Sequence, residues 1–295
     1  MEKIATENVK QPDNIVKRIM TINEIIVNDL WEIEPVNINE THVLSTLQPD
    51  GWVNIVPIFD FYTKSTFCFP VKVIVDSEYA GIGAIIIHKE VAWLAHIIVH
   101  PDFRCRGIGL KIVQSLVKIA KENHCSTIYL IATELGEPIY KKVGFIIETE
   151  YLVYKNITKT EWTVSRNIHQ YKKRYRTHFV AFDRKISGED RIIHVEEYLK
   201  NGFVFHHEEN VEGYYLPSLG EGLIMAETET SGIELLKLYL QHNNRVVFSR
   251  ENLVAQKFLQ EVGFGEVKPI KRMRVGEERK VRFANIYNRI GGNIG

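Results

Sequence analysis

The feature that most constrains the fold is a change of hydrophobic period between residues 91 and 122. Residues 91–99 form a short run rich in Val, Ile and Ala, as expected of a buried β-strand. Apolar residues then recur at helical intervals and predict an amphipathic helix over about 108–122. These residues are Leu110, Val113, Leu116, Val117 and Ala120. A strand that leads directly into such a helix predicts an α/β chain.

A glycine-containing turn joins this strand to this helix, with the sequence Arg104-Cys105-Arg106-Gly107-Ile108-Gly109. Its glycines let the backbone approach a ligand closely, and its N–H groups can converge on a phosphate at the positive end of the helix. Other phosphate motifs fail, because there is no Gly-Lys-Ser/Thr ending and Gly81-Ile82-Gly83 lacks the third glycine of a dinucleotide fingerprint. A Gly-x-Ser-x-Gly hydrolase elbow is also absent.

Short segments on both sides extend this unit. Segments 67–75 and 81–88 are rich in Val and Ile, and together with the strand that follows them they predict an antiparallel meander. Residues Thr127 to Ala132 predict another strand. A short helix should then open near Pro138 and close at Gly144 with a left-handed cap.

The pattern of apolar residues near the start of the chain predicts a helix. Isoleucines at helical spacing, Ile15, Ile19, Ile22 and Ile26, predict a helix from about Asp13 to Leu47. This stretch has no apolar core of signal-peptide length, and no apolar run in the chain is long enough to span a bilayer. We therefore expect a cytoplasmic protein that does not bind membranes.

Composition argues against two further classes of function. Lys plus Arg equals Asp plus Glu, 37 against 37, so the chain lacks the basic excess of a nucleic-acid-binding protein. Cys68, Cys105 and Cys125 are widely spaced, which suits reduced thiols. The cluster His206-His207-Glu208-Glu209 lacks paired ligand spacing, and we expect no metal site.

An internal sequence repeat indicates two lobes. The sequence KKVGF at 141–145 is similar to QEVGF at 260–264, and a helix-forming stretch and a β-rich run precede each copy. A repeat at this distance predicts two copies of one fold and not a solenoid. We interpret the basic, Tyr-containing stretch 160–185 as a solvated connection and not as a nucleic-acid site. The expected domains are 1–155 and 165–295.

The run WLAHIIVHPDFRCRGIGLKIV, followed by IYLIATELGEPIYKKVGF, resembles the GNAT superfamily of N-acetyltransferases. The pyrophosphate loop of that family reads Arg/Gln-x-x-Gly-x-Gly/Ala, and Arg104, Gly107 and Gly109 satisfy it. Later segments, including DRKISGEDRIIHVEEYL and the tail from Ser249, look like a GNAT subgroup with a second, GNAT-like lobe. The resemblance then covers nearly the whole chain.

This resemblance implies a tandem α/β fold with a central, mostly antiparallel, splayed sheet flanked by helices. Domain 1–155 would be catalytic and would bind acetyl-CoA, with free CoA as a product. The backbone of the central strand would hold the pantetheine arm and polarise the thioester carbonyl, and the loop would hold the pyrophosphate. The implied contacts are Ile97, Ile98, Val99, Arg104, Cys105, Arg106, Gly107, Ile108, Gly109 and Leu110.

Four positions carry the expected chemistry around the acetyl group. Tyr140 matches the family's general acid, which protonates the departing thiolate. The base that deprotonates the amine stays open between His96, Glu134 and a chain of water molecules, although Glu134 and Thr133 could instead shape their loop. Trp52 could border the acceptor channel or serve as a lid or core residue.

The second lobe lacks the general-acid tyrosine and the phosphate loop of the first lobe. Position 259 is Leu where an active copy would have Tyr, and the upstream segment has no phosphate loop and carries Glu227 and Glu229, which would repel a pyrophosphate. We therefore predict one cofactor site per chain, with 165–295 as a degenerate lobe that closes the acceptor side of the cleft.

The predicted activity is direct transfer of an acetyl group from acetyl-CoA to a primary amine, most simply a small molecule. A protein N-terminus or lysine, and a longer acyl group, remain alternatives. A non-catalytic CoA-binding sensor is the alternative from another class. A monomer or a homodimer would both suit these hypotheses.

Overall fold

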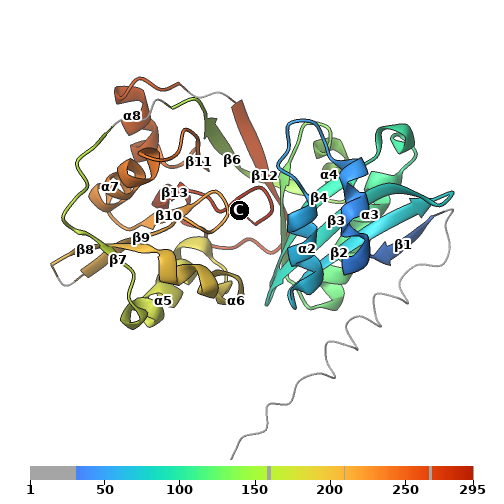
Figure 1. Cartoon of the computed structure of the whole chain (residues 1–295), viewed down its shortest axis with the longest axis horizontal. Coiled ribbons are helices and arrows are strands. Elements are labelled where there is room, and N and C mark those ends of the chain that lie inside the picture. The colour runs from blue at the N-terminus through green and yellow to red at the C-terminus, as the bar shows by residue number, and fades with distance from the viewer. Residues whose placement is uncertain (1–30, 158–160, 209, 266–267, 295) are drawn as a thin grey trace, which may run out of the picture. The chain divides into compact units, whose positions relative to one another are not determined.

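The computed structural model describes residues 31–157, 161–208, 210–265 and 268–294. Strands form two sheets, and helices accompany them (Figure 1). The chain divides into two compact units, Met1–Ala84 with His96–Ile119, and Ile85–Ala95 with Ala120–Gly295. This is the mixed α/β class that the sequence predicts.

The first half of the chain follows the predicted order of strands and helices from residue 67 onward. The three successive strands, the amphipathic helix, the fourth strand and the short helix are all present, and Gly144 has a φ of +99°. The elements are β1 (Glu32–Pro35), η1 (Ile38–Leu47), α2 (Val56–Lys64), β2 (Cys68–Val75), β3 (Glu78–His88), β4 (Val91–Val99), η2 (Pro101–Phe103), α3 (Ile108–Glu122), β5 (Thr127–Ala132), α4 (Glu137–Lys142) and β6 (Ile146–Tyr154).

The predicted helix from Asp13 to Leu47 is wrong where the structure describes it, and its part before residue 31 lies outside the described residues. Glu32–Pro35 is a strand that pairs antiparallel with β2, and Ile38–Leu47 is a 3-10 helix. The strand forms because Ile33 meets Val73 across the ladder, and that partner lies far away in the sequence. A capping box of Asn37 and Glu40 then starts the 3-10 helix.

The second half contributes a smaller sheet and two strands of the larger sheet. Its elements are β7 (Ile168–Gln170), η3 (Lys173–Tyr175), α5 (Arg176–Ser187), α6 (Ile192–Val195), η4 (Glu196–Asn201), β8 (Phe203–His207), β9 (Asn210–Leu216), β10 (Leu223–Ala226), α7 (Glu229–Leu240), β11 (Val246–Ser249), α8 (Leu253–Glu261), β12 (Lys268–Gly276), η5 (Phe283–Asn285) and β13 (Ile286–Asn288). The smaller sheet has the order β13-β10-β9-β8-β7.

The larger sheet has the order β1-β2-β3-β4-β5-β12-β6-β11. Strand β12 therefore lies between β5 and β6, which precede it by more than a hundred residues, and it pairs antiparallel with both. Figure 1 shows β12, drawn in red, beside the green β6. The pairing of β4 with β5 is parallel.

The repeated Val-Gly-Phe sequences adopt the same local structure. In the first copy, the Phe145 N–H donates to the carbonyl of Tyr140 over 3.0 Å, and in the second copy the Phe264 N–H donates to the carbonyl of Leu259 over 2.8 Å. Each glycine has a positive φ, +99° at Gly144 and +88° at Gly263. Each motif also follows a strand and a helix, β5 and α4 or β11 and α8. The internal sequence repeat thus marks a repeated supersecondary unit.

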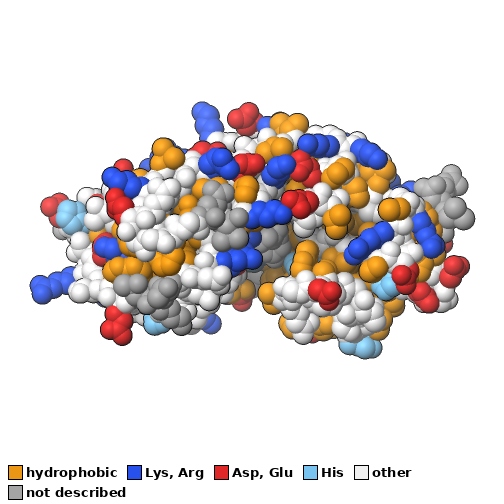
Figure 2. All heavy atoms as spheres, turned by 90° about the horizontal axis from the view of Figure 1, so that it is seen from above, with side chains coloured by type: hydrophobic (Ala, Val, Ile, Leu, Met, Phe, Trp, Pro, Cys, Tyr) orange, Lys and Arg blue, Asp and Glu red, His pale blue; other side chains and the backbone are white. Residues whose placement is uncertain are grey.

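Charged side chains of both signs are interspersed on the face shown in Figure 2. This pattern agrees with the balance of 37 basic and 37 acidic residues. No helix within the described residues is both long and apolar enough to cross a membrane.

Candidate functional site

The turn between β4 and α3 has an unusual backbone. Cys105 and Gly107 both have positive φ, +60° and +88°. The first backbone hydrogen bond of α3 runs from the Lys111 N–H to the carbonyl of Gly107, at 3.0 Å. Within the part of the chain that the structure describes, the backbone N–H groups of residues 105–110 have no hydrogen-bond acceptor. These donors lie at the N-terminus of a helix of 15 residues, where the helix dipole favours an anion.

Side chains on both sides hold this turn in place. The Arg104 Nε donates to the carbonyl of Val99 over 3.2 Å, and the Arg106 guanidinium lies 5.2 Å from the centre of the buried Phe103 ring. A Cβ placed on Gly107 would lie 3.9 Å from the Trp31 ring. The turn therefore offers unpartnered amides beside an aromatic ring, which fits the pyrophosphate of a nucleotide-like cofactor. Sequence reasoning did not single out Trp31, because only the fold brings it to the turn.

The Gly81-Ile82-Gly83 sequence has a packing role. A Cβ on Gly83 would lie 2.7 Å from Ile112 of α3, and a Cβ on Gly81 would lie 3.0 Å from both Ile112 and the carbonyl oxygen of Ile98. Two glycines on β3 thus allow close packing of the helix that follows the turn. Both glycines lie inside strand β3 and not in a turn that opens a helix.

Strand β4 leaves its neighbour halfway along its length. Its register with β5 runs from Val91 opposite Thr127 to Leu94 opposite Leu130. Strand β4 continues to Val99, and β5 continues to Ala132. His96 follows this last pair closely and has a φ of +49°, which is rare for a residue other than glycine. Ile97, Ile98 and Val99 lie between this irregularity and the turn.

Aromatic residues surround the His96 side chain. Its ring centre lies 5.7 Å from that of Tyr62, 5.8 Å from that of Phe59 and 6.3 Å from that of Trp52. The Tyr62 hydroxyl lies 3.1 Å from the His96 Nδ1. Burial lowers the pKa of His96 to about 4, so the imidazole is neutral at physiological pH. The Trp52 side chain is partly open to solvent, with 44% of its surface exposed.

The fold thus brings together the predicted residues Trp52 and His96. It also adds Phe59 and Tyr62 from α2, which sequence reasoning missed. Their spacing of three residues indicates only that both lie on one face of a helix. Their proximity to His96 depends on how α2 packs, which the sequence does not reveal.

Tyr140 belongs to the second compact unit, and its approach to the acetyl group stays a prediction. Its side chain is 6% exposed and lies against Gly136, where a Cβ would come within 2.8 Å of the hydroxyl oxygen. Burial raises the pKa of Tyr140 to about 12. The phenol therefore keeps its proton throughout the physiological range, as a proton donor must.

Glu134 and Thr133 lie in the loop that precedes α4. The Glu134 side chain is 80% exposed and forms an ion pair with Lys268 at 2.7 Å, which holds its pKa below the usual value. The Thr133 hydroxyl accepts a hydrogen bond from the Gly136 N–H at 3.2 Å. Glu134 is thus an ionised surface group, and Thr133 shapes the loop.

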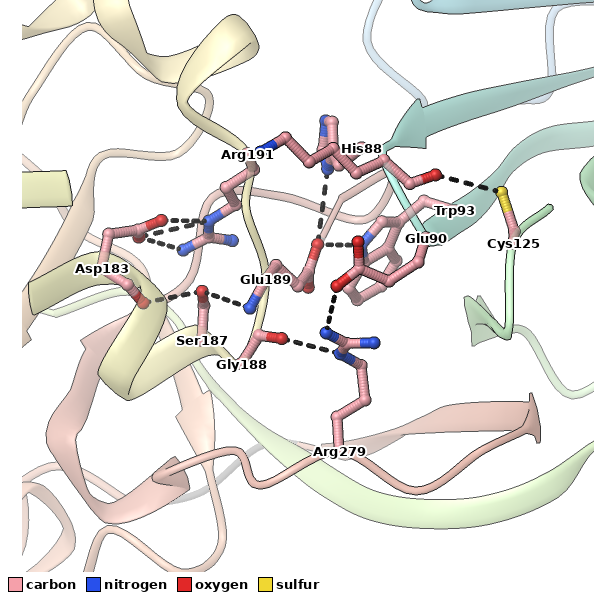
Figure 3. A network of polar contacts seen from close by, with 11 residues as sticks. His88, Glu90, Trp93, Cys125, Asp183, Ser187, Gly188, Glu189, Arg191 and Arg279 are labelled. Atoms are coloured by element: carbon pink, nitrogen blue, oxygen red, sulfur yellow. Dashed lines mark hydrogen bonds and ion pairs between the residues drawn. The ribbon is translucent and has the colours of Figure 1, made fainter. Parts of the chain in front are cut away.

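A buried polar network anchors the turn between β3 and β4 and the first half of β4 (Figure 3). The Trp93 Nε1 donates to the Glu189 carboxylate at 3.0 Å, and the His88 Nδ1 lies 3.4 Å from the same oxygen. Burial disfavours the charge on Glu189, but the hydrogen bond from His88 and the charge of Arg191 outweigh it and lower the pKa of the carboxyl. The segment after α5 therefore fixes where β4 begins.

A second pair of contacts supports the same turn. The Arg279 side chain donates to the Glu90 carboxylate at 2.8 Å and to the carbonyl of Gly188 at 2.7 Å (Figure 3). Cys125, one of three free cysteines, donates from Sγ to the carbonyl of Lys89 at 3.7 Å.

Comparisons with known proteins agree with this geometry. Residues 27–145 match the model of the acetyltransferase (GNAT) family. A search of the curated proteins finds no match to this sequence. The fold is similar to that of a candidate acetyltransferase from Pyrococcus horikoshii, with a TM-score of 0.78 and 19% identity over 92% of this chain and 98% of that one.

Two further solved structures share the fold at lower similarity. A GCN5-related N-acetyltransferase from Sphaerobacter thermophilus gives a TM-score of 0.60 and 13% identity, over 88% of this chain and 100% of that one. A tandem GNAT protein from the clavulanic acid biosynthesis pathway gives 0.57 and 11%, over 85% and 99%. Residues 27–145 thus match the GNAT acetyltransferase family model, and the fold over most of the chain is similar to that of a tandem GNAT protein.

Proposed function

We propose that the chain is an acetyl-CoA-dependent N-acetyltransferase with a primary amine as acceptor. The observation that carries this proposal is the group of unpartnered amides at residues 105–110, at the end of a strand that has left its neighbour. Phosphate oxygens would accept hydrogen bonds from those donors. Beyond Leu94, where β4 no longer pairs with β5, main-chain groups of Ile97, Ile98 and Val99 could hydrogen-bond the amide-containing arm of the cofactor.

The proposed chemistry distributes roles among this chain's own residues. Acetyl-CoA, when bound, supplies the thioester that the amine attacks. Backbone N–H groups of β4 would stabilise the negative charge that develops on the carbonyl oxygen. The Tyr140 Oη would give its proton to the departing sulfur. Among the candidates for the base, the exposed and ion-paired Glu134 is poorly suited, which leaves His96 or water.

We propose a small molecule as the acceptor. Trp52 is partly exposed beside His96 and offers an aromatic surface to a cationic or apolar amine. Residues of the second lobe also lie against the helix that carries Tyr140, because Lys271 pairs with Glu137 of α4 at 2.7 Å. A second lobe that bordered the acceptor would hinder a folded protein acceptor more than a small amine. A protein N-terminus or lysine remains the alternative acceptor.

One cofactor site per chain is supported by the start of α7, the helix that follows β10. The Thr228 hydroxyl accepts from the Ser231 N–H at 3.2 Å and donates to the Glu212 carboxylate at 2.7 Å. Side chains thus cap this helix, and Glu229 adds negative charge in its first turn. A phosphate there would meet a side-chain cap and the negative charge of Glu229.

The test is to measure binding of acetyl-CoA by calorimetry and then release of free CoA with a panel of amines and peptides. Binding at one site per chain, followed by amine-dependent release of CoA, is the expected result. Binding without release by any acceptor would favour the CoA-binding sensor. Absence of binding would overturn the proposal. Sedimentation of the same sample would decide between monomer and homodimer, and cell fractionation would test the cytoplasmic location.

A further inference from the structure

The hydrogen bond between Tyr62 and His96 assigns a role that the sequence left open. We propose that Tyr62 is a positioning residue that fixes His96 as a neutral imidazole with its proton on Nε2. In this state His96 donates a hydrogen bond to the acetyl carbonyl oxygen and does not act as the general base. The proposal deepens the acetyltransferase function and rests on it.

The direction of the hydrogen bond follows from the two groups. A phenol is a good donor and a neutral imidazole nitrogen is a good acceptor, and the atoms are 3.1 Å apart. Tyr62 is 1% exposed, so its hydroxyl needs a partner inside the protein. When the Tyr62 hydroxyl donates to Nδ1, the single proton of the neutral ring must sit on Nε2.

The surroundings of His96 favour the neutral ring. Phe59, Tyr62 and Trp52 supply aromatic rings on its sides, and within the described residues no carboxylate forms an ion pair with it. The charged groups of the adjoining helix α2 are Asp60 and Lys64, and Asp60 accepts a hydrogen bond from Thr41. A protonated imidazolium would lack a counter-charge there, whereas a neutral donor needs none.

The backbone also holds His96 in one position. Its φ of +49° within β4 places the ring at the point where pairing with β5 has ended. A residue in this conformation persists only where its surroundings determine it, and such residues concentrate at functional sites. The hydroxyl of Tyr62 and the rings around His96 hold its side chain in this position.

The reaction balances with His96 as a donor. The amine nitrogen forms a bond to the acetyl carbon, and the carbon–sulfur bond breaks. The sulfur takes a proton from Tyr140, the amine gives its proton to water, and solvent restores the phenol. His96 gains and loses no proton, and its Nε2–H stabilises the oxygen as charge develops. A neutral histidine serves as an electrophile in this way in triosephosphate isomerase.

The first test observes the tautomer and needs neither cofactor nor acceptor. In a nitrogen-15 NMR spectrum between pH 6 and 8, we expect the His96 Nε2 to carry the proton and Nδ1 to be unprotonated. Tyr62→Phe should remove this preference and give a mixture of tautomers. Tyr79→Phe, a matched change whose hydroxyl bonds Glu40, should leave the spectrum of His96 unchanged. A proton on Nδ1 in the wild-type protein would overturn the proposal even if the protein is an acetyltransferase.

The second test compares two replacements of His96 that strain the backbone similarly. His96→Gln keeps an N–H donor but cannot act as a base, and His96→Leu removes both functions. We expect kcat to fall by about 100-fold in His96→Leu, as for loss of one oxyanion donor, and by much less in His96→Gln. Equal loss in both variants would contradict the donor role. Lack of activity in the wild-type protein would instead count against the proposed function.

Discussion

Tyr140 is a phenol that the protein keeps protonated. Its ring is buried against Gly136 and stacks edge-on with Phe145 at 6.2 Å between ring centres, and burial raises its pKa to about 12. If this proton moves to the departing sulfur, Tyr140→Phe should lower kcat by about 100-fold, within the range for a general acid. Acetyl-CoA affinity should stay the same, because the ring remains.

Steady-state kinetics and calorimetry of Tyr140→Phe would check this, with Tyr215→Phe as a control in the core of the second lobe. An unchanged kcat in Tyr140→Phe would remove the residue from the mechanism. A parallel loss of acetyl-CoA affinity would instead indicate a packing role.

Gly107 is the residue on which the backbone of the proposed cofactor turn depends. Its φ of +88° is strained for any side chain, and its neighbours offer unpartnered amides. Gly107→Glu adds a negative side chain at that point and should abolish acetyl-CoA binding in calorimetry. Gly263 has the same φ of +88° in the second copy of the motif, with nothing within 4 Å of its Cβ position. Gly263→Glu should therefore bind like wild type, and wild-type affinity in Gly107→Glu would refute the loop assignment.

At the scale of single elements, β12 is held in the larger sheet by a buried arginine. The Arg272 guanidinium lies 4.0 Å from the centre of the Tyr129 ring and 4.7 Å from that of Trp93, and its Nε donates to Glu148 at 2.6 Å. Burial disfavours the charge on Arg272, but the nearby tyrosine and glutamate side chains outweigh this effect and raise the pKa of the guanidinium above its ordinary value. The guanidinium thus joins β12 to β4, β5 and β6 at once.

Replacement of this arginine should destabilise the protein strongly. Arg272→Leu leaves the buried Glu148 carboxylate with only the longer ion pair to Arg274 at 3.4 Å, so we expect a loss of about 3 to 5 kcal/mol in the free energy of unfolding. Lys271→Leu, the neighbouring change at a more exposed ion pair with Glu137, should cost much less. Urea unfolding of both variants measures the difference. Similar losses in the two variants would show that the Arg272 contacts do not hold the strand.

Elements with local signals could be predicted from the sequence, and elements that depend on distant partners could not. Strand β5 and helix α3 were expected at 127–132 and about 108–122, because the pattern of apolar residues within each segment indicates its secondary structure. Strand β1 has four residues, and only its pairing with β2 makes it a strand. The insertion of β12 between β5 and β6 leaves no mark in the local pattern.

The candidate site divides in the same way. The turn at 104–110 is contiguous, so a motif could identify it. The contact between Tyr62 and His96 joins a helix to a strand more than thirty residues later, and the position of Trp31 at Gly107 depends equally on the fold. Sequence reasoning therefore singled out the turn at 104–110, His96 and Trp52, and missed Phe59 and Tyr62.

At the scale of the whole molecule, two histidines with lowered pKa values contribute to the response to acid. Burial lowers the pKa of His96 to about 4 and, with the charges of His88 and Arg191, that of His194 to about 3. Both values lie below the unfolded value of about 6.5, so the unfolded chain binds more protons between these limits. The stability that each histidine contributes is complete above about pH 6.5 and declines as the pH falls toward its folded pKa.

We therefore expect the free energy of unfolding to decrease by up to about 1.4 kcal/mol per pH unit for each histidine below pH 6.5. Urea unfolding at pH 7 and pH 4.5 would measure this decrease. His194→Gln should reduce the slope, whereas His42→Gln, at an exposed position, should not. A slope that is the same in His194→Gln and wild type would mean that other groups control the acid response.

The position of β12 has a consequence for how the chain is made. Synthesis proceeds from the N-terminus, and early segments tend to fold first. Strands β5 and β6 leave the ribosome long before β12 exists, so their facing edges must wait without the strand that finally separates them. Two exposed edges can pair with each other or with other chains. The newly made chain thus needs β12, a strand of its second half, to fill the gap between β5 and β6 in the larger sheet.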